Sequence, residues 1–326
     1  MNVCVLGAGT MGHGIAQVSA MGGHDVVLRD INEGIVEEAL EHVRENLQGG
    51  VDRGKVTEAE RDAALDRIDG TTDLDAAVGD ADILIEAVPE DEELKQDVLS
   101  EAETHAPSDC VVASNTSSIS VTGIASALDD PTRAVGLHFF NPVHIMGLVE
   151  VVLAEQTSDA TRAFAEEFVE SVEKTAVVVE DSPGFATSRL GVALGVEAMR
   201  MVQEGVASPR DIDAAMELGY NHPMGPIELG DVVGLDVRLD ILEHLREELG
   251  ERFRPPTILR RKVRAGKLGK KSGEGFYVWE DGEIVGVSGE SASDADELSG
   301  ESASDADELS GESASDADEL RRETDG

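Results

Sequence analysis

Asn2-Val-Cys-Val-Leu-Gly-Ala-Gly-Thr-Met-Gly12 is the stretch of the chain that decides its fold. Its first five residues are mostly apolar and predict a buried parallel strand. The residues from Gly14 to Ala20 predict a helix directly after the glycines. Gly7 suits a tight turn, Gly9 allows the backbone to approach a pyrophosphate, and Gly12 allows the helix to pack close to the strand.

A second strand, Asp25 to Arg29, is followed by Asp30. The carboxylate at this spacing can accept hydrogen bonds from a ribose diol and repel a 2′-phosphate. Strand, glycine turn, helix, strand and acid together predict a dinucleotide site in which the helix N-terminus binds the phosphates, with NAD as the cofactor. Arg29 argues against a strict preference for NAD, because a guanidinium there could hold the extra phosphate of NADP.

A second informative stretch, Gly136-Leu-His-Phe-Phe-Asn-Pro-Val-His-Ile-Met-Gly-Leu-Val-Glu-Val-Val152, predicts strand, loop and strand. Asn141-Pro142 ends the first apolar run, since proline cannot donate to a ladder. Each run contains one ionisable residue, His138 or Glu150, and burial is costly unless such groups are paired. We therefore expect the two to bind each other, leaving one ring nitrogen free to accept a proton. The alternatives are two unrelated strand-end residues or a satisfied core histidine.

The rest of the first half alternates helical and strand patterns, which is typical of an α/β domain with a mostly parallel sheet. Helices are predicted over 32–48, 57–66, 91–105 and 159–173, and strands over 67–71, 82–86, 110–113, 133–137 and 175–179. Gly49-Gly50 is expected to end the first helix, and Thr57 with Glu60 forms a capping box for the second. Ser114-Asn-Thr-Ser-Ser118 follows a strand at the edge where such sheets bind ligands, although it could be a plain helix cap.

The pattern becomes helical, with little strand, at Asp181-Ser-Pro-Gly-Phe185. Helices are predicted over 185–204, 209–218, 231–250 and 256–265. The sequence thus predicts a Rossmann-type NAD-binding domain over 1–182 and an all-α C-terminal domain over 183–284, whose first helix suits a buried position or a subunit interface. Residues 252–271 form a basic island, which is either a solvated helix face or an attraction for a polyanionic substrate.

From Ser288 the chain repeats Ser-Gly-Glu-Ser-Ala-Ser-Asp-Ala-Asp-Glu-Leu three times. One leucine per repeat cannot build a core, so residues 285–326 are predicted to be a disordered acidic tail. Calcium binding by Asp-Ala-Asp-Glu is an alternative, although the repeat lacks the glycine and the distal glutamate of an EF-hand loop. We expect no metal site.

The charge of the chain excludes some partners. With 68 acidic and 26 basic residues, the formal net charge is −42, which would repel nucleic acid and anionic membranes. An acidic globular protein of this kind suggests adaptation to high salt, where self-repulsion is screened. Cys4 and Cys110 fall in predicted strands and indicate core residues in a reducing compartment. Without a signal peptide or a long apolar run, we expect a cytoplasmic protein.

Seven motifs resemble the 3-hydroxyacyl-CoA dehydrogenase family, in the short form similar to 3-hydroxybutyryl-CoA dehydrogenases. They are Gly7-Ala-Gly-Thr-Met-Gly12, Ser114-Asn-Thr-Ser-Ser118, His138-Phe-Phe-Asn-Pro142, Leu148-Val-Glu-Val151, Asp181-Ser-Pro-Gly-Phe185, His222-Pro-Met-Gly-Pro226 and Gly273-Glu-Gly-Phe-Tyr277. The resemblance covers residues 1–280. It implies NAD-dependent oxidation of a (S)-3-hydroxyacyl-CoA to the 3-oxoacyl-CoA, and a homodimer formed through the helical domain.

The resemblance also implies roles for single residues. His138 would be the general base, Glu150 would polarise it, and Ser117 would bind the substrate oxygen near the nicotinamide. Cofactor contacts are implied for Gly7, Ala8, Gly9, Thr10, Met11, Gly12, Asp30, Glu90, Lys95, Ser117, Asn141 and Lys271. Lys55 is the implied CoA contact in the first domain.

One position departs from the family pattern, in which an asparagine completes the catalytic set. Here Ser188 stands in its place, within Pro183-Gly-Phe-Ala-Thr-Ser-Arg189. Serine can still donate a hydrogen bond, but it is shorter, and losing one such donor costs about 10²-fold in turnover. Two other functions stay open. One is a dehydrogenase of a free 3-hydroxy acid or sugar acid, since relatives of this fold share the same His and Glu motif. The other is a non-catalytic NAD-binding protein, which Ser188 and the long acidic tail suggest.

Overall fold

The computed structural model describes residues 1–289, so residues 290–326 of the predicted acidic tail lie outside the described residues. The described chain forms two compact units. The first contains residues 1–192 and 244–253, and the second contains 193–243 and the described residues from 254 onward. Among residues 1–289, no helix combines the length and apolar character needed to cross a membrane.

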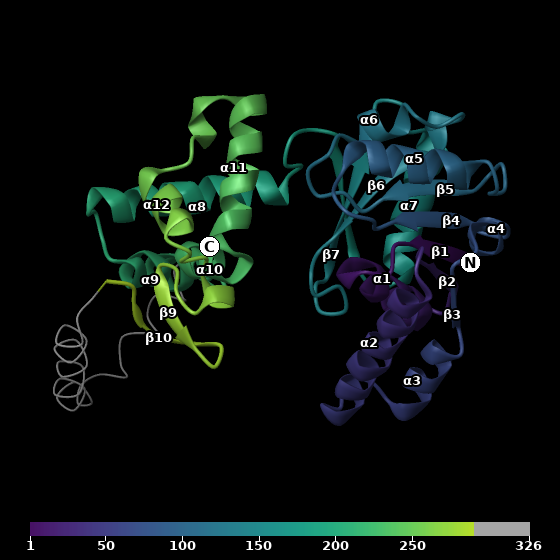
Figure 1. Ribbon diagram of the computed structural model, residues 1–326, viewed down its shortest axis with the longest axis horizontal. Coiled ribbons are helices and arrows are strands. Elements are labelled where there is room, and N and C mark those ends of the chain that lie inside the picture. The colour runs from purple at the N-terminus through teal and green to yellow at the C-terminus, as the bar shows by residue number, and fades with distance from the viewer. Residues whose placement is uncertain (290–326) are drawn as a thin grey trace, which may run out of the picture. The chain divides into compact units, whose positions relative to one another are not determined.

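An eight-stranded sheet organises the first unit, in the order β3-β2-β1-β4-β5-β6-β7-β8 (Figure 1). The strands are β1 (Asn2–Leu6), β2 (Asp25–Arg29), β3 (Ile68–Thr71), β4 (Ile83–Glu86), β5 (Val111–Ser114), β6 (Ala134–Phe139), β7 (Leu148–Leu153) and β8 (Thr175–Glu180). All neighbouring pairs are parallel except β6 and β7. The predicted mostly parallel Rossmann-type sheet is confirmed.

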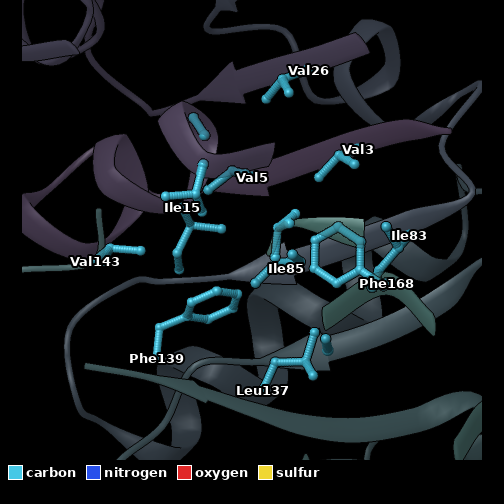
Figure 2. Close-up of a cluster of buried hydrophobic side chains, with 14 of the residues drawn as sticks. Val3, Val5, Ile15, Val26, Ile83, Ile85, Leu137, Phe139, Val143 and Phe168 are labelled. Carbon is cyan, nitrogen blue, oxygen red and sulfur yellow. The ribbon is translucent and has the colours of Figure 1, made fainter. Parts of the chain in front are cut away.

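Alternate residues of the strands build two separate hydrophobic cores, one on each face of the sheet. Val3, Val5, Ile83 and Ile85 belong to one core, together with Ile15 of a helix (Figure 2). Cys4, Leu6 and Leu84 belong to the other. Strands with both faces buried read as continuous apolar runs, which is why the sequence marks them clearly.

Seven α-helices lie wholly within this unit. They are α1 (Thr10–Met21), α2 (Glu33–Asp52), α3 (Glu58–Leu65), α4 (Leu74–Val78), α5 (Glu92–Glu103), α6 (Val121–Ala125) and α7 (Asp159–Ser171). The predicted capping box of Thr57 and Glu60 is present at α3. The predicted end of α2 at Gly49-Gly50 is wrong, because the helix continues to Asp52. Gly50 is buried there, and a Cβ at this position would lie 2.9 Å from Val56 Cγ2, so the glycine serves close packing.

The second half of the chain is helical and closes with a small hairpin. Its elements are α8 (Thr187–Glu204), α9 (Pro209–Tyr220), α10 (Pro226–Val233), α11 (Leu235–Leu249), α12 (Thr257–Arg264), β9 (Tyr277–Glu280) and β10 (Glu283–Val287). The single helix predicted over 231–250 is two helices, separated at Gly234, whose φ is 106°. Only glycine adopts this conformation readily, so the chain turns there. The motif Gly273-Glu-Gly-Phe-Tyr277 leads into an antiparallel pair, β9 and β10.

Two buried carboxylates tie the second unit together. Asp231 accepts hydrogen bonds from the N–H groups of Phe276 and Tyr277, so it fixes the hairpin to α10. Asp213 of α9 accepts the N–H of Ile227 at the start of α10 and the hydroxyl of Tyr277. Burial raises the pKa of both carboxyl groups.

Candidate active site

A cavity of about 530 Å³ lies at the carboxyl ends of β1, β2 and β4. It is lined by the glycine turn after β1, by residues from the end of β2 to the start of α2, by the loop after β4 and by α5, namely Gly7, Gly9, Thr10, Met11, Arg29, Asp30, Ile31, Ile35, Ala87, Val88, Pro89, Leu94 and Val98. The chain continues from β1 to one side of the sheet and from β4 to the other, so this is the point where strand order reverses. Open α/β sheets bind their ligands at such a point.

The three glycines that follow β1 differ in what surrounds them. A Cβ on Gly12 would lie 1.8 Å from the carbonyl oxygen of Gly7, and a Cβ on Gly7 would lie 2.7 Å from the carbonyl oxygen of Ala87. A Cβ on Gly9 would meet nothing within 4 Å. The first two glycines therefore let backbone segments pack closely, while Gly9 leaves its approach open. This cradle fits a pyrophosphate bound by the start of α1.

Asp30 is fixed by its neighbours. Its carboxylate accepts the N–H of Ala8 at 2.9 Å and of Ile31 at 2.7 Å, which ties the end of β2 to the glycine turn. The Arg29 guanidinium donates to the carbonyl of Thr72 at 3.4 Å. The residues present thus fit a dinucleotide with an unmodified ribose, as NAD has.

His138 and Glu150 are direct cross-strand partners in the antiparallel pair of β6 and β7. Nδ1 of His138 lies 2.8 Å from Oε2 of Glu150, and their side chains are 8% and 0% exposed. The ring of Phe140 packs against the imidazole in a tilted arrangement, with ring centroids 4.4 Å apart. The ring centroid of Phe185 lies 5.7 Å from that of the imidazole. Within residues 1–289, Nε2 has no hydrogen-bond partner, so it is the nitrogen left to exchange a proton.

Glu150 also binds the start of α8. Its Oε1 accepts the N–H of Ala186 at 3.0 Å and of Thr187 at 2.8 Å, and its Oε2 accepts the Thr187 hydroxyl at 2.9 Å. Burial alone would raise the pKa of Glu150, but hydrogen bonds from His138 and Thr187 outweigh it and hold the pKa below the ordinary value. The carboxylate is thus kept ionised beside the imidazole.

The Thr187 hydroxyl was missed by sequence reasoning, because its partner lies on a distant strand. We expect Thr187→Val, which keeps the shape and the backbone N–H, to lower the free energy of unfolding by about 2 kcal/mol, since a bond to a charged group is lost. Turnover should fall by up to roughly tenfold, because Glu150 then orients His138 less firmly. Thermal unfolding and steady-state kinetics measure both effects. Thr187→Ser, which keeps the hydroxyl, should behave like the parent; equal losses in both variants would contradict this role.

The hydroxyl-rich turn after β5 is held by Glu90. One oxygen of this carboxylate accepts the Thr116 hydroxyl at 2.7 Å, the Ser117 N–H at 2.9 Å and the Ser117 hydroxyl at 3.2 Å. Asn115 in the same turn accepts the N–H of Phe139 at 2.9 Å, next to His138 in β6. The turn is therefore fixed to the strand that carries the imidazole.

The remaining predicted site residues lie on several elements, and Lys95 contacts Glu90 at 3.2 Å. Lys95 lies in α5 with its ammonium buried, and Asn141 is exposed just after β6. Lys55 is exposed in the turn after α2, and Lys271 binds Asp236 at 2.7 Å in the second unit. Within the described part of the chain the Ser188 hydroxyl makes no hydrogen bond. Their roles stay predictions.

Fold and cavity together define a dinucleotide-binding α/β protein with a histidine–carboxylate pair at the same edge of its sheet. The family model described as the NAD binding domain of 3-hydroxyacyl-CoA dehydrogenase matches residues 2–182, and the model of the C-terminal domain matches residues 184–279. This chain belongs to the 3-hydroxyacyl-CoA dehydrogenase family, and its first part is an NAD-binding domain.

Individual relatives agree with this family assignment. A probable 3-hydroxybutyryl-CoA dehydrogenase of Deinococcus radiodurans is 43% identical over 278 residues, which cover 85% of this chain and 99% of the relative. A 3-hydroxybutyryl-CoA dehydrogenase of Mycobacterium tuberculosis is 44% identical over 280 residues, or 85% and 98% of the two chains. The crystal structure of (S)-3-hydroxybutyryl-CoA dehydrogenase from Ralstonia eutropha matches with a TM-score of 0.82 at 41% identity, over 86% of this chain and 99% of that one.

Proposed function

We propose that this protein oxidises (S)-3-hydroxyacyl-CoA, such as 3-hydroxybutyryl-CoA, to the 3-oxoacyl-CoA with NAD. The observation that carries the proposal is the buried pair of His138 and Glu150, whose free Nε2 lies at the edge of the sheet that holds the cofactor cavity. Bound NAD would accept the hydride from C3. The chain must then remove the hydroxyl proton, which is the task of a general base with one free ring nitrogen.

Each side chain has one role in this proposal. His138 takes the hydroxyl proton on Nε2, and the ionised Glu150 stabilises the imidazolium that forms. The Ser117 N–H stays bound to Glu90, and the Ser117 hydroxyl, which contacts Glu90 at 3.2 Å, turns to the substrate oxygen when substrate binds. Ser188 remains available as a second donor, because its hydroxyl is not engaged by another described residue. We place the boundary between the NAD-binding domain and the helical substrate and dimerisation domain near residue 182.

The direct test is NADH oxidation with acetoacetyl-CoA and longer 3-oxoacyl-CoAs at high salt. We expect turnover with a CoA thioester and none with free acetoacetate. Turnover only with free acetoacetate or a keto sugar acid would replace the CoA substrate by a free acid. No turnover with any of them, while NADH still binds, would leave a non-catalytic NAD-binding protein.

The same proposal includes a homodimer formed through the helical unit. Large apolar side chains are exposed there, including Val206, Leu218 and Tyr220, of which Leu218 is 87% exposed. Exposed apolar surface of this kind is typical of a protein interface. Sedimentation should give a dimer for the parent and a monomer for Leu218→Glu with Tyr220→Glu, whereas a monomeric parent would contradict the proposal.

Adaptation to high salt is a further part of the proposal, supported by the net charge of −42. Raising KCl from about 0.1 M to about 1 M shortens the screening length from about 10 Å to about 3 Å, which weakens repulsion among the acidic residues. We therefore expect the melting temperature to rise with salt. NaCl at equal concentration should act similarly, because screening depends on ionic strength. A melting temperature that falls or stays constant across this range would contradict salt adaptation.

A further inference from the structure

The helix α12 presents two arginines that no acidic side chain of residues 1–289 binds. Among its basic residues, Arg260 has an ion pair and Lys262 is partly buried. Arg261 and Arg264 are exposed and three residues apart, so they are neighbours on one side of the helix. Neither guanidinium has an ion pair or a hydrogen bond within the described part of the chain. A carboxylate bound between them would relieve their mutual repulsion.

Other basic side chains of the same region already have partners. Lys267 and Lys271 form ion pairs, and the Lys270 ammonium lies over the ring of Trp279, 5.1 Å from its centroid. The Arg252 guanidinium lies over the Phe253 ring in the same way. An acidic segment can therefore bind the α12 arginines without first breaking an ion pair.

The chain leaves the hairpin of the second unit beside this helix. The N–H of Ser288, directly after β10, donates to the carbonyl oxygen of Phe276 at 2.9 Å. The Lys262 ammonium donates to the Ser288 hydroxyl at 3.3 Å. Lys262 follows Arg261 directly, and successive side chains of a helix point about 100° apart. The segment after Ser288 therefore starts next to the side of α12 that carries Arg261.

The segment that starts there has the complementary charge. Residues 290–326 contain 14 acidic side chains and two arginines. Glu290 and Asp294 come two and six residues after Ser288, so an extended chain keeps both within about 20 Å of it. A short tether of this kind gives an effective concentration in the millimolar range. Ion pairs that would be weak between separate molecules are thus favoured within one chain.

We propose that Arg261 and Arg264 form a docking surface for the acidic segment 290–326 of the same chain. The interaction is electrostatic, and salt shortens the screening length from about 10 Å at 0.1 M to about 3 Å at 1 M. The segment is therefore bound at low ionic strength and released as salt rises. Nothing in this inference requires turnover of an acyl-CoA, so it stands or falls separately from the proposed function.

The test measures energy transfer in the full-length protein from Trp279, its single tryptophan, to an uncharged acceptor dye on Ser304→Cys. Cys4 and Cys110 are 0% exposed, so the dye reacts with the added thiol. Raising KCl from about 0.1 M to about 1 M should lower the transfer by about half, since screening releases the segment. An undocked segment should show the opposite change, because a charged chain extends by self-repulsion at low salt and contracts when screened.

Charge reversal on α12 tests the docking surface itself. Arg261→Glu with Arg264→Glu should lower the transfer at about 0.1 M KCl to the level that the parent shows at about 1 M. The matched control is Arg44→Glu with Arg162→Glu, which changes the net charge equally on exposed helix positions of the first unit. The control should keep the transfer of the parent at both salt concentrations.

Neutralising the segment provides a second route if the α12 variant fails to fold. Asp294→Asn, Asp296→Asn and Glu297→Gln together should lower the transfer at low salt as the α12 variant does. Mixing the labelled protein with an excess of Trp279→Phe protein should leave the transfer unchanged, because donor and acceptor belong to one chain. A loss of transfer on mixing would assign the segment to a second copy and overturn the proposal.

Two further results would overturn it. One is transfer in the parent that rises with salt, as for an undocked segment. The other is an α12 variant whose transfer equals that of the parent at both salt concentrations. If that variant also raised the KM for acetoacetyl-CoA, the two arginines would bind the anionic substrate instead of the segment.

Discussion

His138→Gln should lower turnover with acetoacetyl-CoA by about 10³-fold and leave NADH affinity within about threefold of the parent. Glutamine keeps a polar group beside Glu150 but cannot carry the proton between hydroxyl and solvent. The imidazole takes no part in lining the cofactor cavity, so binding should survive. Steady-state kinetics and NADH titration separate the two effects.

The matched control is His144→Gln, which removes an imidazole from the loop after β6. His144 lies against a different cavity, beside Lys174 and the end of α1, and no role in proton transfer is proposed for it. Its variant should turn over like the parent. A fully active His138→Gln would remove His138 as the base, and comparable losses in both variants would show that the loop, not the dyad, is being disturbed.

Gly12→Ala should have the second large effect, on NADH binding and on stability together. The added Cβ would lie 1.8 Å from the carbonyl oxygen of Gly7, so helix and turn must separate. Overpacking of this kind costs about 3 kcal/mol. Displacing the N–H groups at the start of α1 from the phosphates should raise the Kd of NADH by about 10²-fold. Thermal unfolding with and without NADH measures both.

Gly191→Ala is the control for an added methyl group. A Cβ at Gly191 meets nothing within 4 Å, and the residue lies inside α8. Alanine there should stabilise the protein by about 0.5–1 kcal/mol through helix propensity. If Gly12→Ala matched the parent in both melting temperature and NADH affinity, the role of Gly12 in packing α1 closely against the turn would be contradicted.

Sequence patterns located the parts of the fold that depend on local rules. The glycine turn and the strands buried on both faces were predicted because each leaves a short, strong signal. The double glycine in α2 misled the prediction, since the cost of about 1 kcal/mol per glycine is outweighed by tertiary packing at Gly50. Gly234 carried a usable signal, but only its positive φ shows that it divides two helices.

The candidate site was predictable only in part, because some of its contacts join segments that are distant in sequence. His138 and Glu150 could be paired from sequence because each stands alone in an apolar run. Lys95 was predicted from the family resemblance, and its burial could have been predicted too, because it lies on the same helical face as the buried Leu99 and Ala102. Thr187 could not be found, since its hydrogen bond to Glu150 joins segments distant in sequence. Contacts of this kind depend on how the chain folds back, which composition and spacing do not encode.

The antiparallel pairing of β6 and β7 makes the dyad a consequence of strand alignment. Side chains alternate between the two faces of a sheet, so a shift of one residue would send His138 and Glu150 to opposite faces. If β7 shifted in this way, Val149 and Val151 would leave the core that they share with Leu137 and Phe139, and the charged Glu150 would enter it, which penalises the shift strongly. Insertions within residues 140–147 leave this alignment intact, whereas a single deletion inside either strand would separate acid from base. The hydrophobic core itself therefore maintains the alignment that the chemistry needs, and the loop contributes Val143 to that core.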